Sequence, residues 1–404
     1  MKKILLTICA VLCVLSPLAS LDFGLNIGDI TDYSKISQNE ISQTNTASLW
    51  LTAPIKDFTF AGSIVYKFNY TWNPLTQTVK PFQIDVGSLE FGGFFVLPGT
   101  NPSGIRFDAG RIQASDITGR VFSAKSDGFN AAWIYKNITL GSQLYFNGLT
   151  LKNNSVISLS PQDALDKANA AVLFGAPRIV YSVYALFQEF ALRQSFNVEV
   201  MGQNDLRPAA DPRVHSYYGI ARLSGPLASV FRYSLGSSFS VLQSNQTFTF
   251  AQLILANISL RIPSAKTNLT LSGIYTMPWG TGNTAGFVPV NAQSVSVVFP
   301  ELKHNTVTFI GFEAAWQPAS FFSGGVKTNA YLKQNPTSLP LSVLRSDSTS
   351  PFVGTELSLY GSFIVSSEFS FMVSSGLFII NPLAVTEGTN IAPFRLSVSA
   401  TLKI

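Results

Sequence analysis

The charged side chains of this chain stand at isolated positions inside segments that are otherwise apolar or rich in hydroxyl groups. Those that could act on dissolved ions are Arg106, Asp108, Arg178, Glu199, Arg222, Arg232, Lys327 and Glu356. The guanidinium group of arginine binds carboxylates and phosphates through two parallel hydrogen bonds, so four arginines along one path would attract anions. The alternative is that acidic members of this set pair locally with basic ones and leave no selective path.

Catalytic and metal-binding chemistry has little support in the sequence. The chain has 2 histidines, His215 and His304, and neither belongs to an evident constellation with Asp and Ser that would activate a nucleophile. The 2 cysteines, Cys9 and Cys13, both lie near the N-terminus, and no GxxxxGK phosphate loop occurs. We therefore expect no catalytic residue, no metal site, no cofactor and no enzymatic activity.

Residues 1–20 have the pattern of a secretory signal. Lys2 and Lys3 precede the apolar run Ile4 to Leu15, and the small residues Ala19 and Ser20 offer a cleavage point. The apolar run is too short to span a bilayer comfortably. We therefore expect the segment to be removed on export, which leaves residues 21–404 without a cysteine.

The composition of the remainder indicates strands in contact with an apolar phase. Hydrophobic residues make up 46% and charged residues 12% of the sequence, yet no later apolar run reaches the length of a transmembrane helix. Instead, apolar and polar residues alternate, as in PFRLSVSATLKI at 393–404, where the even positions from Phe394 are apolar. Basic and acidic residues nearly balance and do not cluster, which argues against a nucleic-acid partner.

About eighteen alternating segments can be counted, and their connections alternate in length. From a first strand at 22–28, the odd-numbered connections include 29–45, 150–177 and 278–304, whereas the even-numbered ones are short. Two odd-numbered connections, near 206–212 and 244–247, are short as well. Strands that cross a membrane back and forth produce this alternation of long and short connections. A change of face between Val86 and Leu89 also predicts a bulge in the fourth strand.

Together these features resemble a bacterial outer-membrane porin, and FDAGRIQASDITGRVFSAKSDGFNAAWIY resembles the larger substrate-specific channels and alginate-export barrels. The resemblance implies an all-β fold over residues 21–404, a transmembrane antiparallel up-and-down β-barrel of about 16–18 strands in the bacterial outer membrane. Outer-membrane lipid, small solutes and the barrel-assembly machinery would be its partners. Proteobacterial porins usually end in Phe, whereas this sequence ends in Ile404. A soluble β-sandwich, propeller or solenoid is less favoured, because its solvent face would carry more charge.

Three function classes remain open for such a barrel. The primary hypothesis is a channel (porin) that passes small hydrophilic solutes through a water-filled lumen. Anionic solutes are one class that such a channel could select. The alternatives are a transporter of hydrophobic ligands such as fatty acids and a surface-exposed adhesin or structural barrel. A helix is expected after Ser160 in the 150–177 loop. This loop either folds into the pore or lies on the surface. The apolar 278–304 loop folds inward, caps the barrel or contacts another subunit. The sequence does not determine the oligomeric state, and a homo-oligomer is one of the alternatives.

Overall fold

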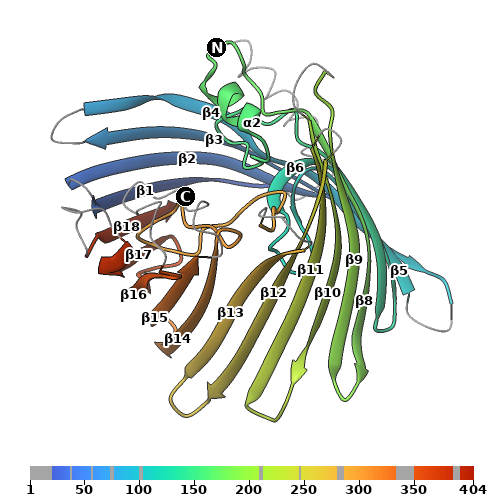
Figure 1. The fold of residues 1–404 in the computed structure, drawn as a ribbon. Coiled ribbons are helices and arrows are strands. Elements are labelled where there is room, and N and C mark those ends of the chain that lie inside the picture. Colours follow the sequence, from blue (N-terminus) through green and yellow to red (C-terminus); the bar gives the residue numbers. More distant parts are fainter. Residues whose placement is uncertain are drawn as a thin grey trace.

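The computed structural model describes residues 21–404 except 37–38, 56–57, 73–76, 100–102, 209–212, 245–246, 280–285, 334–349 and 385–391. The predicted signal segment, residues 1–20, lies outside the described residues. Eighteen antiparallel strands form one sheet that closes on itself (Figure 1), which confirms the predicted fold class.

The strands are β1 (Asp22–Lys35), β2 (Asn39–Ile55), β3 (Phe58–Trp72), β4 (Gln77–Leu97), β5 (Ser103–Ser115), β6 (Ser123–Tyr135), β7 (Ile138–Phe146), β8 (Arg178–Ala191), β9 (Gln194–Asp205), β10 (Val214–Pro226), β11 (Phe231–Ser244), β12 (Thr247–Ile262), β13 (Thr267–Trp279), β14 (Val307–Ala319), β15 (Phe322–Lys333), β16 (Phe352–Ile364), β17 (Phe369–Ile380) and β18 (Phe394–Lys403). The helix α2 (Pro161–Ala168) lies between β7 and β8, and the 3-10 turn η1 (Pro382–Ala384) follows β17. Among the residues that the structure describes, no helix has both the length and the apolar character to cross a membrane.

Pairing of β1 with β18 closes the barrel. The two strands are joined over ten residue pairs, and the main chains of Leu25 and Ile404 exchange hydrogen bonds of 2.7 and 2.8 Å. The strands lie side by side in Figure 1, β1 in blue and β18 in red. Closure leaves no open sheet edge between them, as an apolar membrane core requires.

The strands have an apolar outward face and a lumen face. On β18, Val398 and Leu402 are exposed on the outside of the barrel. Arg395 points the other way, where it pairs with Asp32 at 3.2 Å and donates to the Val297 carbonyl of an inward-folded connection at 3.5 Å. The terminal stretch PFRLSVSATLKI therefore places its apolar residues outside and its polar residues inside, as its alternation predicts.

The predicted long connection at 29–45 is wrong. β1 extends to Lys35, β2 begins at Asn39, and fourteen residue pairs join the two strands. The alternation does not reveal this part because its outward positions, among them Asp29 and Gln43, are polar. The structure thus has a long β-ribbon where the pattern indicates a loop.

The tip of the β5–β6 hairpin leaves the barrel wall. β4 pairs with β5 only between Leu97 and Leu89, and residues 112–126 beyond that point pair with one another. Gly110 has φ +111°, and a Cβ there would lie 1.9 Å from the Leu89 carbonyl oxygen, so this bend requires glycine. The bulge predicted between Val86 and Leu89 is confirmed at Gly87, where the β3–β4 register skips one residue.

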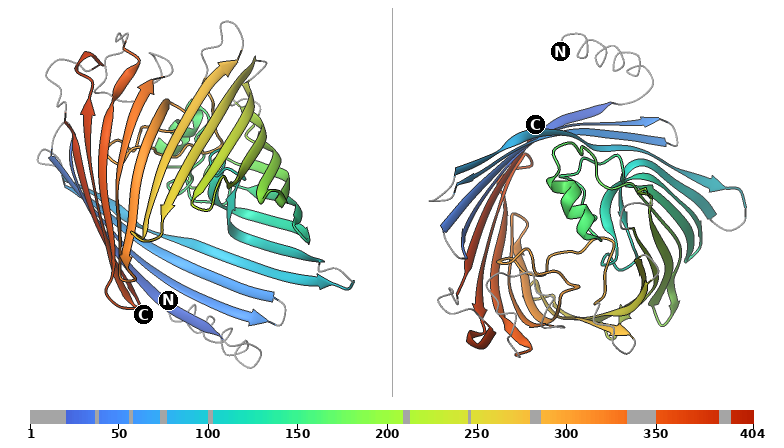
Figure 2. Two further views of the ribbon diagram at one scale, coloured as in Figure 1. Left: turned by 90° about the horizontal axis from the view of Figure 1, so that it is seen from below. Right: turned by 45° about the horizontal axis from the view of Figure 1, so that its top comes forward.

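Three connections fold into the lumen. They are the hairpin tip with residues 116–122, the β7–β8 connection at 147–177 with α2, and the described part of the β13–β14 connection at 286–306, called the lumen loop below. In the right view of Figure 2, α2 lies inside the ring of strands. Phe122, Ile157 and Phe287, one from each connection, belong to a single buried apolar cluster with the lumen faces of the strands. For the 150–177 and 278–304 loops, inward folding is the predicted alternative that holds for the residues described.

Candidate functional site

Several cavities open into the lumen of the described chain. One, of about 760 Å³ at the β12–β13 and β14–β15 turns, has Arg261 and Lys266 in its lining, and three others are named below. The long-loop cavity, about 400 Å³, has Lys67, Arg111 and Lys125 in its lining. The middle cavity, about 840 Å³, lies against β3–β7 and includes Glu90. The short-turn cavity, about 900 Å³, lies beside the β8–β9 and β10–β11 turns.

The short-turn cavity is basic. Arg222 and Arg232, both predicted site residues, line it together with Arg193 and one carboxylate, Glu189. The Arg222 guanidinium donates to the Ser234 hydroxyl at 3.0 Å, a contact that leaves its charge uncompensated. Three cations against one anion give this end of the lumen a positive potential, which raises the local concentration of anions.

Arg106 and Asp108 form a local ion pair in the middle cavity. Arg106 Nε lies 2.9 Å from Asp108 Oδ2, and the Arg106 side chain is 61% exposed. Glu90 lines the same cavity. Two carboxylates and one guanidinium leave no net positive charge here. Local pairing, the second of the two predicted alternatives, therefore describes this part of the lumen.

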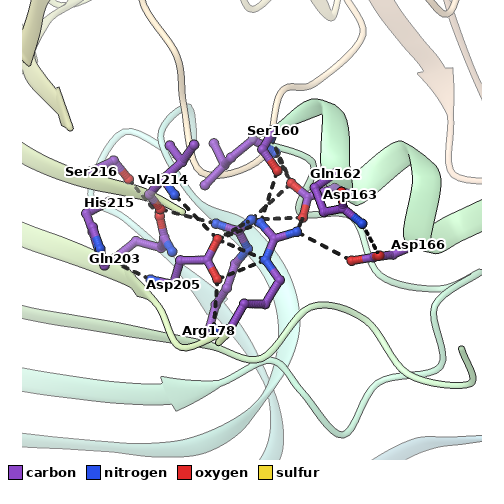
Figure 3. A network of polar contacts seen from close by, with 12 residues as sticks. Ser160, Gln162, Asp163, Asp166, Arg178, Gln203, Asp205, Val214, His215 and Ser216 are labelled. Atoms are coloured by element: carbon purple, nitrogen blue, oxygen red, sulfur yellow. Dashed lines mark hydrogen bonds and ion pairs between the residues drawn. The ribbon is translucent and has the colours of Figure 1, made fainter. Parts of the chain in front are cut away.

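Arg178 lies in a sealed network of charges and not at a water-filled surface. Its side chain is fully buried, and its guanidinium lies 2.9 Å from Asp163 of α2 and 3.0 Å from Asp205 of β9 (Figure 3). Arg207 contacts the same two carboxylates at 3.2 and 2.6 Å. Arg207 also lies 3.4 Å from Asp166 of α2. Because these two cations and three carboxylates pair with one another, Arg178 holds α2 against the β8–β9 wall.

The start of α2 explains why Asp163 reaches this network. The helix begins at Pro161, directly after Ser160 as predicted. The Asp163 carboxylate accepts a hydrogen bond of 2.8 Å from the Ser160 N–H, so one carboxylate both caps the helix and pairs with Arg178.

Glu199 and Glu356 hold the inward-folded connections by their main chains. The buried Glu199 carboxylate accepts from the Ile117 N–H of the hairpin tip at 2.8 Å. The buried Glu356 carboxylate accepts from the N–H groups of Val297 and Val298 in the lumen loop at 3.0 and 3.4 Å. Both predicted site residues therefore position loops and do not line an open path.

Lys327 is the remaining predicted site residue. It is half-buried on β15, opposite Glu313 of β14 and Ser358 of β16 in register. The Glu313 carboxylate accepts a hydrogen bond from the Tyr360 hydroxyl. Lys327 lies outside the linings of the three cavities defined above.

The lumen loop is tied to the hairpin tip around His304. The imidazole is fully buried, and its Nδ1 accepts from the Gln293 N–H at 3.1 Å. Arg120 of the hairpin tip donates to the Gln293 side-chain oxygen at 2.9 Å. Burial lowers the pKa of His304 to about 4, and the nearby Arg120 cation acts in the same direction. The seated loop therefore contains a neutral histidine.

Sequence reasoning missed Asp205, Arg207 and Arg111. Asp205 shares the lumen phase of Glu199 on β9, so the period of two could have found it. Arg111 pairs with Asp85 at 3.1 Å and with Asp127 at 2.9 Å at the bend of the hairpin, which no local pattern indicates. In the described part of the chain, no group of three or more His, Cys, Asp and Glu side chains is placed to hold a metal ion.

No known family model matches this chain, and no curated protein matches it. Several solved structures do. OprD of Pseudomonas aeruginosa is 11% identical with a TM-score of 0.53, and the match covers 95% of this chain and 96% of that one. The outer membrane protein OpdK of the same organism is 9% identical with a TM-score of 0.55, over 95% and 99% of the two chains.

OccAB4 of Acinetobacter baumannii is 10% identical with a TM-score of 0.58, over 95% of this chain and 98% of that one. At such low identity the likeness concerns the fold. It agrees with the resemblance found in the sequence and with the closed sheet of eighteen strands. This chain therefore has the β-barrel fold of an outer-membrane protein.

Proposed function

We propose that this chain is an outer-membrane channel that passes small hydrophilic solutes and favours anions. The observation that carries the proposal is the short-turn cavity of about 900 Å³, lined by Arg193, Arg222, Arg232 and one carboxylate, Glu189. In outer-membrane barrels the short turns face the periplasm. The basic cavity then forms the periplasmic vestibule of the pore. Its hydroxyl, amide and charged lining suits hydrophilic solutes better than fatty acids.

Export and assembly belong to the same proposal. Residues 1–20 direct the chain out of the cytoplasm and are removed, and residues 21–404 form the barrel. The β1–β18 seam ends at Ile404, whose main chain pairs with Leu25. We infer that the barrel-assembly machinery recognises this terminal strand with Ile404 in place of Phe.

Conductance in planar bilayers tests the channel. Purified protein in its folded, heat-modifiable form is expected to give ohmic steps of fixed size, with a reversal potential that indicates anion preference in a salt gradient. A folded protein that gives no conductance would contradict the proposal.

Charge removal tests the basic vestibule. A cation about 7 Å from a permeating anion contributes roughly 0.6 kcal/mol at the dielectric constant of water, about 2.7-fold in local anion concentration. The double variant Arg222→Ser/Arg232→Ser should therefore lower the local anion concentration about sevenfold and raise the local cation concentration by the same factor. The anion-to-cation permeability ratio should then fall by up to about 50-fold at low salt. The control Lys136→Asn removes a cation from a short turn outside the three cavities and should leave the ratio unchanged. An equal ratio in the double variant and the wild type would exclude the role of the two arginines.

A further inference from the structure

The outward face of the barrel carries a carboxylate where β1 meets β2. Asp29 lies on the same face as Ile27 and Leu49, which are 42% and 62% exposed on the outside. In register it stands opposite Asn45 of β2 and Ala400 of β18. It is the eighth of the 14 residues of β1, so it lies at mid-length of the strand and not at a rim.

Asp29 belongs to a group of polar side chains on this face, called the outward patch below: Asp29, Thr31, Gln43 and Asn45. The Gln43 amide donates a hydrogen bond of 2.8 Å to the Asp29 carboxylate, and the Thr31 hydroxyl donates one of 3.2 Å to the same carboxylate. Within the described chain, the side-chain hydrogen bonds of Asp29 thus come from neutral groups only. This patch is also why the outer halves of β1 and β2 do not show as strands in the sequence.

A patch of this kind is costly against lipid. A carboxylate and carboxamides on the lipid-facing side of a strand lose water without gaining full compensation. The Asp29 carboxylate has about four acceptor positions and each carboxamide two donor hydrogens, so most of this capacity is unused inside one barrel. The neighbouring outward residues Ala47 and Ala400 are small, which allows another chain to approach closely.

We propose that the outward patch is the contact surface of a homodimer, in which the Asn45 amide of one copy donates to the Asp29 carboxylate of the other. A second copy fits because the patch is self-complementary: it holds the acceptor and the donors, and a two-fold axis pairs each with its counterpart. The contact removes the carboxylate from lipid and hydrogen-bonds it. This inference rests on the membrane location in the proposed function and not on the selectivity of the channel.

Disulfide trapping tests the contact. The only cysteines of the chain are Cys9 and Cys13 in the segment that is removed, so Asn45→Cys introduces a single thiol. Oxidation in isolated outer membranes should convert most of this variant to a dimer. Val200→Cys is the matched control, since Val200 is 65% exposed on the outward face of β9 and should stay monomeric. The inference is overturned if both variants stay monomeric in folded form, or if Asn45→Cys cross-links to a different protein.

Removal of the carboxylate gives a second, independent measurement. Asp29→Leu should weaken dimerisation in detergent at least tenfold by analytical ultracentrifugation, whereas Asp29→Asn keeps an acceptor oxygen and should weaken it less. Wild-type dimerisation of Asp29→Leu would contradict the inference. Conductance and cross-linking are read separately. A silent dimer counts against the channel alone, and a conducting monomer counts against the dimer alone.

Discussion

Replacement of Glu356 by alanine should release the lumen loop and widen the pore. The buried carboxylate accepts hydrogen bonds from the N–H groups of Val297 and Val298 at 3.0 and 3.4 Å. It also accepts from the hydroxyls of Ser296 and Ser358. Alanine leaves all of these donors without their acceptor, while β16 itself keeps its ladder of main-chain hydrogen bonds.

The size of the effect follows from the two main-chain donors, because the hydroxyls can rotate toward other acceptors. Each buried donor left unpaired costs about 1–3 kcal/mol, so seating of the loop should weaken by about 2–6 kcal/mol. That range corresponds to a factor of roughly 30 to 20,000 in the ratio of seated to released loop. The buried side chains of Val298, Phe299 and Leu302 still hold the loop in the variant. We therefore expect the loop to open frequently but not to leave the lumen permanently.

Single-channel recording and limited proteolysis measure this effect together. Glu356→Ala should show a larger or flickering conductance and faster cleavage within residues 286–306. Glu356→Gln is the matched control, since its carbonyl oxygen preserves one acceptor and about half of the effect should disappear. Wild-type conductance and wild-type protease resistance of Glu356→Ala would refute the view that this carboxylate anchors the loop.

Two other perturbations probe the buried charges. Arg178→Met leaves the buried carboxylates of Asp163 and Asp205 less compensated, and an uncompensated buried charge costs about 3–5 kcal/mol. The temperature midpoint of unfolding, measured by gel migration, should therefore fall. An unchanged midpoint would mean that the network contributes nothing to stability. Because the pKa of His304 is about 4 in the seated loop and 6.5 ordinarily, the loop is fully seated above pH 6.5 and loosens as the pH falls toward 4. Conductance should therefore rise across that window, and His304→Gln should show a flat profile if the histidine is responsible.

The strands were largely predictable because side-chain alternation is a local property of an extended chain. β18 at Phe394–Lys403 lies within the predicted segment 393–404, and the bulge at Gly87 lies within the predicted change of face. The start of α2 is equally local, since it depends on Ser160 and the residues directly after it. Where the outward positions turned polar, at Asp29 and its neighbours, the same rule failed and two strands appeared too short.

The alternation predicts which charged residues face the lumen but not which of them contact water. The phase of each strand places Arg178, Arg222 and Glu356 inside the barrel, and the structure agrees. Phase does not say which charges meet water. Arg222 lines a cavity, whereas Arg178 is sealed between carboxylates of α2 and β9.

Side-chain alternation is enough to predict a sheet with one apolar and one polar face, long enough to close on itself. How the interior is used depends on tertiary contacts. Inward folding of three connections depends on contacts between residues far apart in the chain, such as Ile117 with Glu199 and Val297 with Glu356. A period of two residues carries no information about such contacts, because burial and pairing arise only when separate strands surround a common lumen.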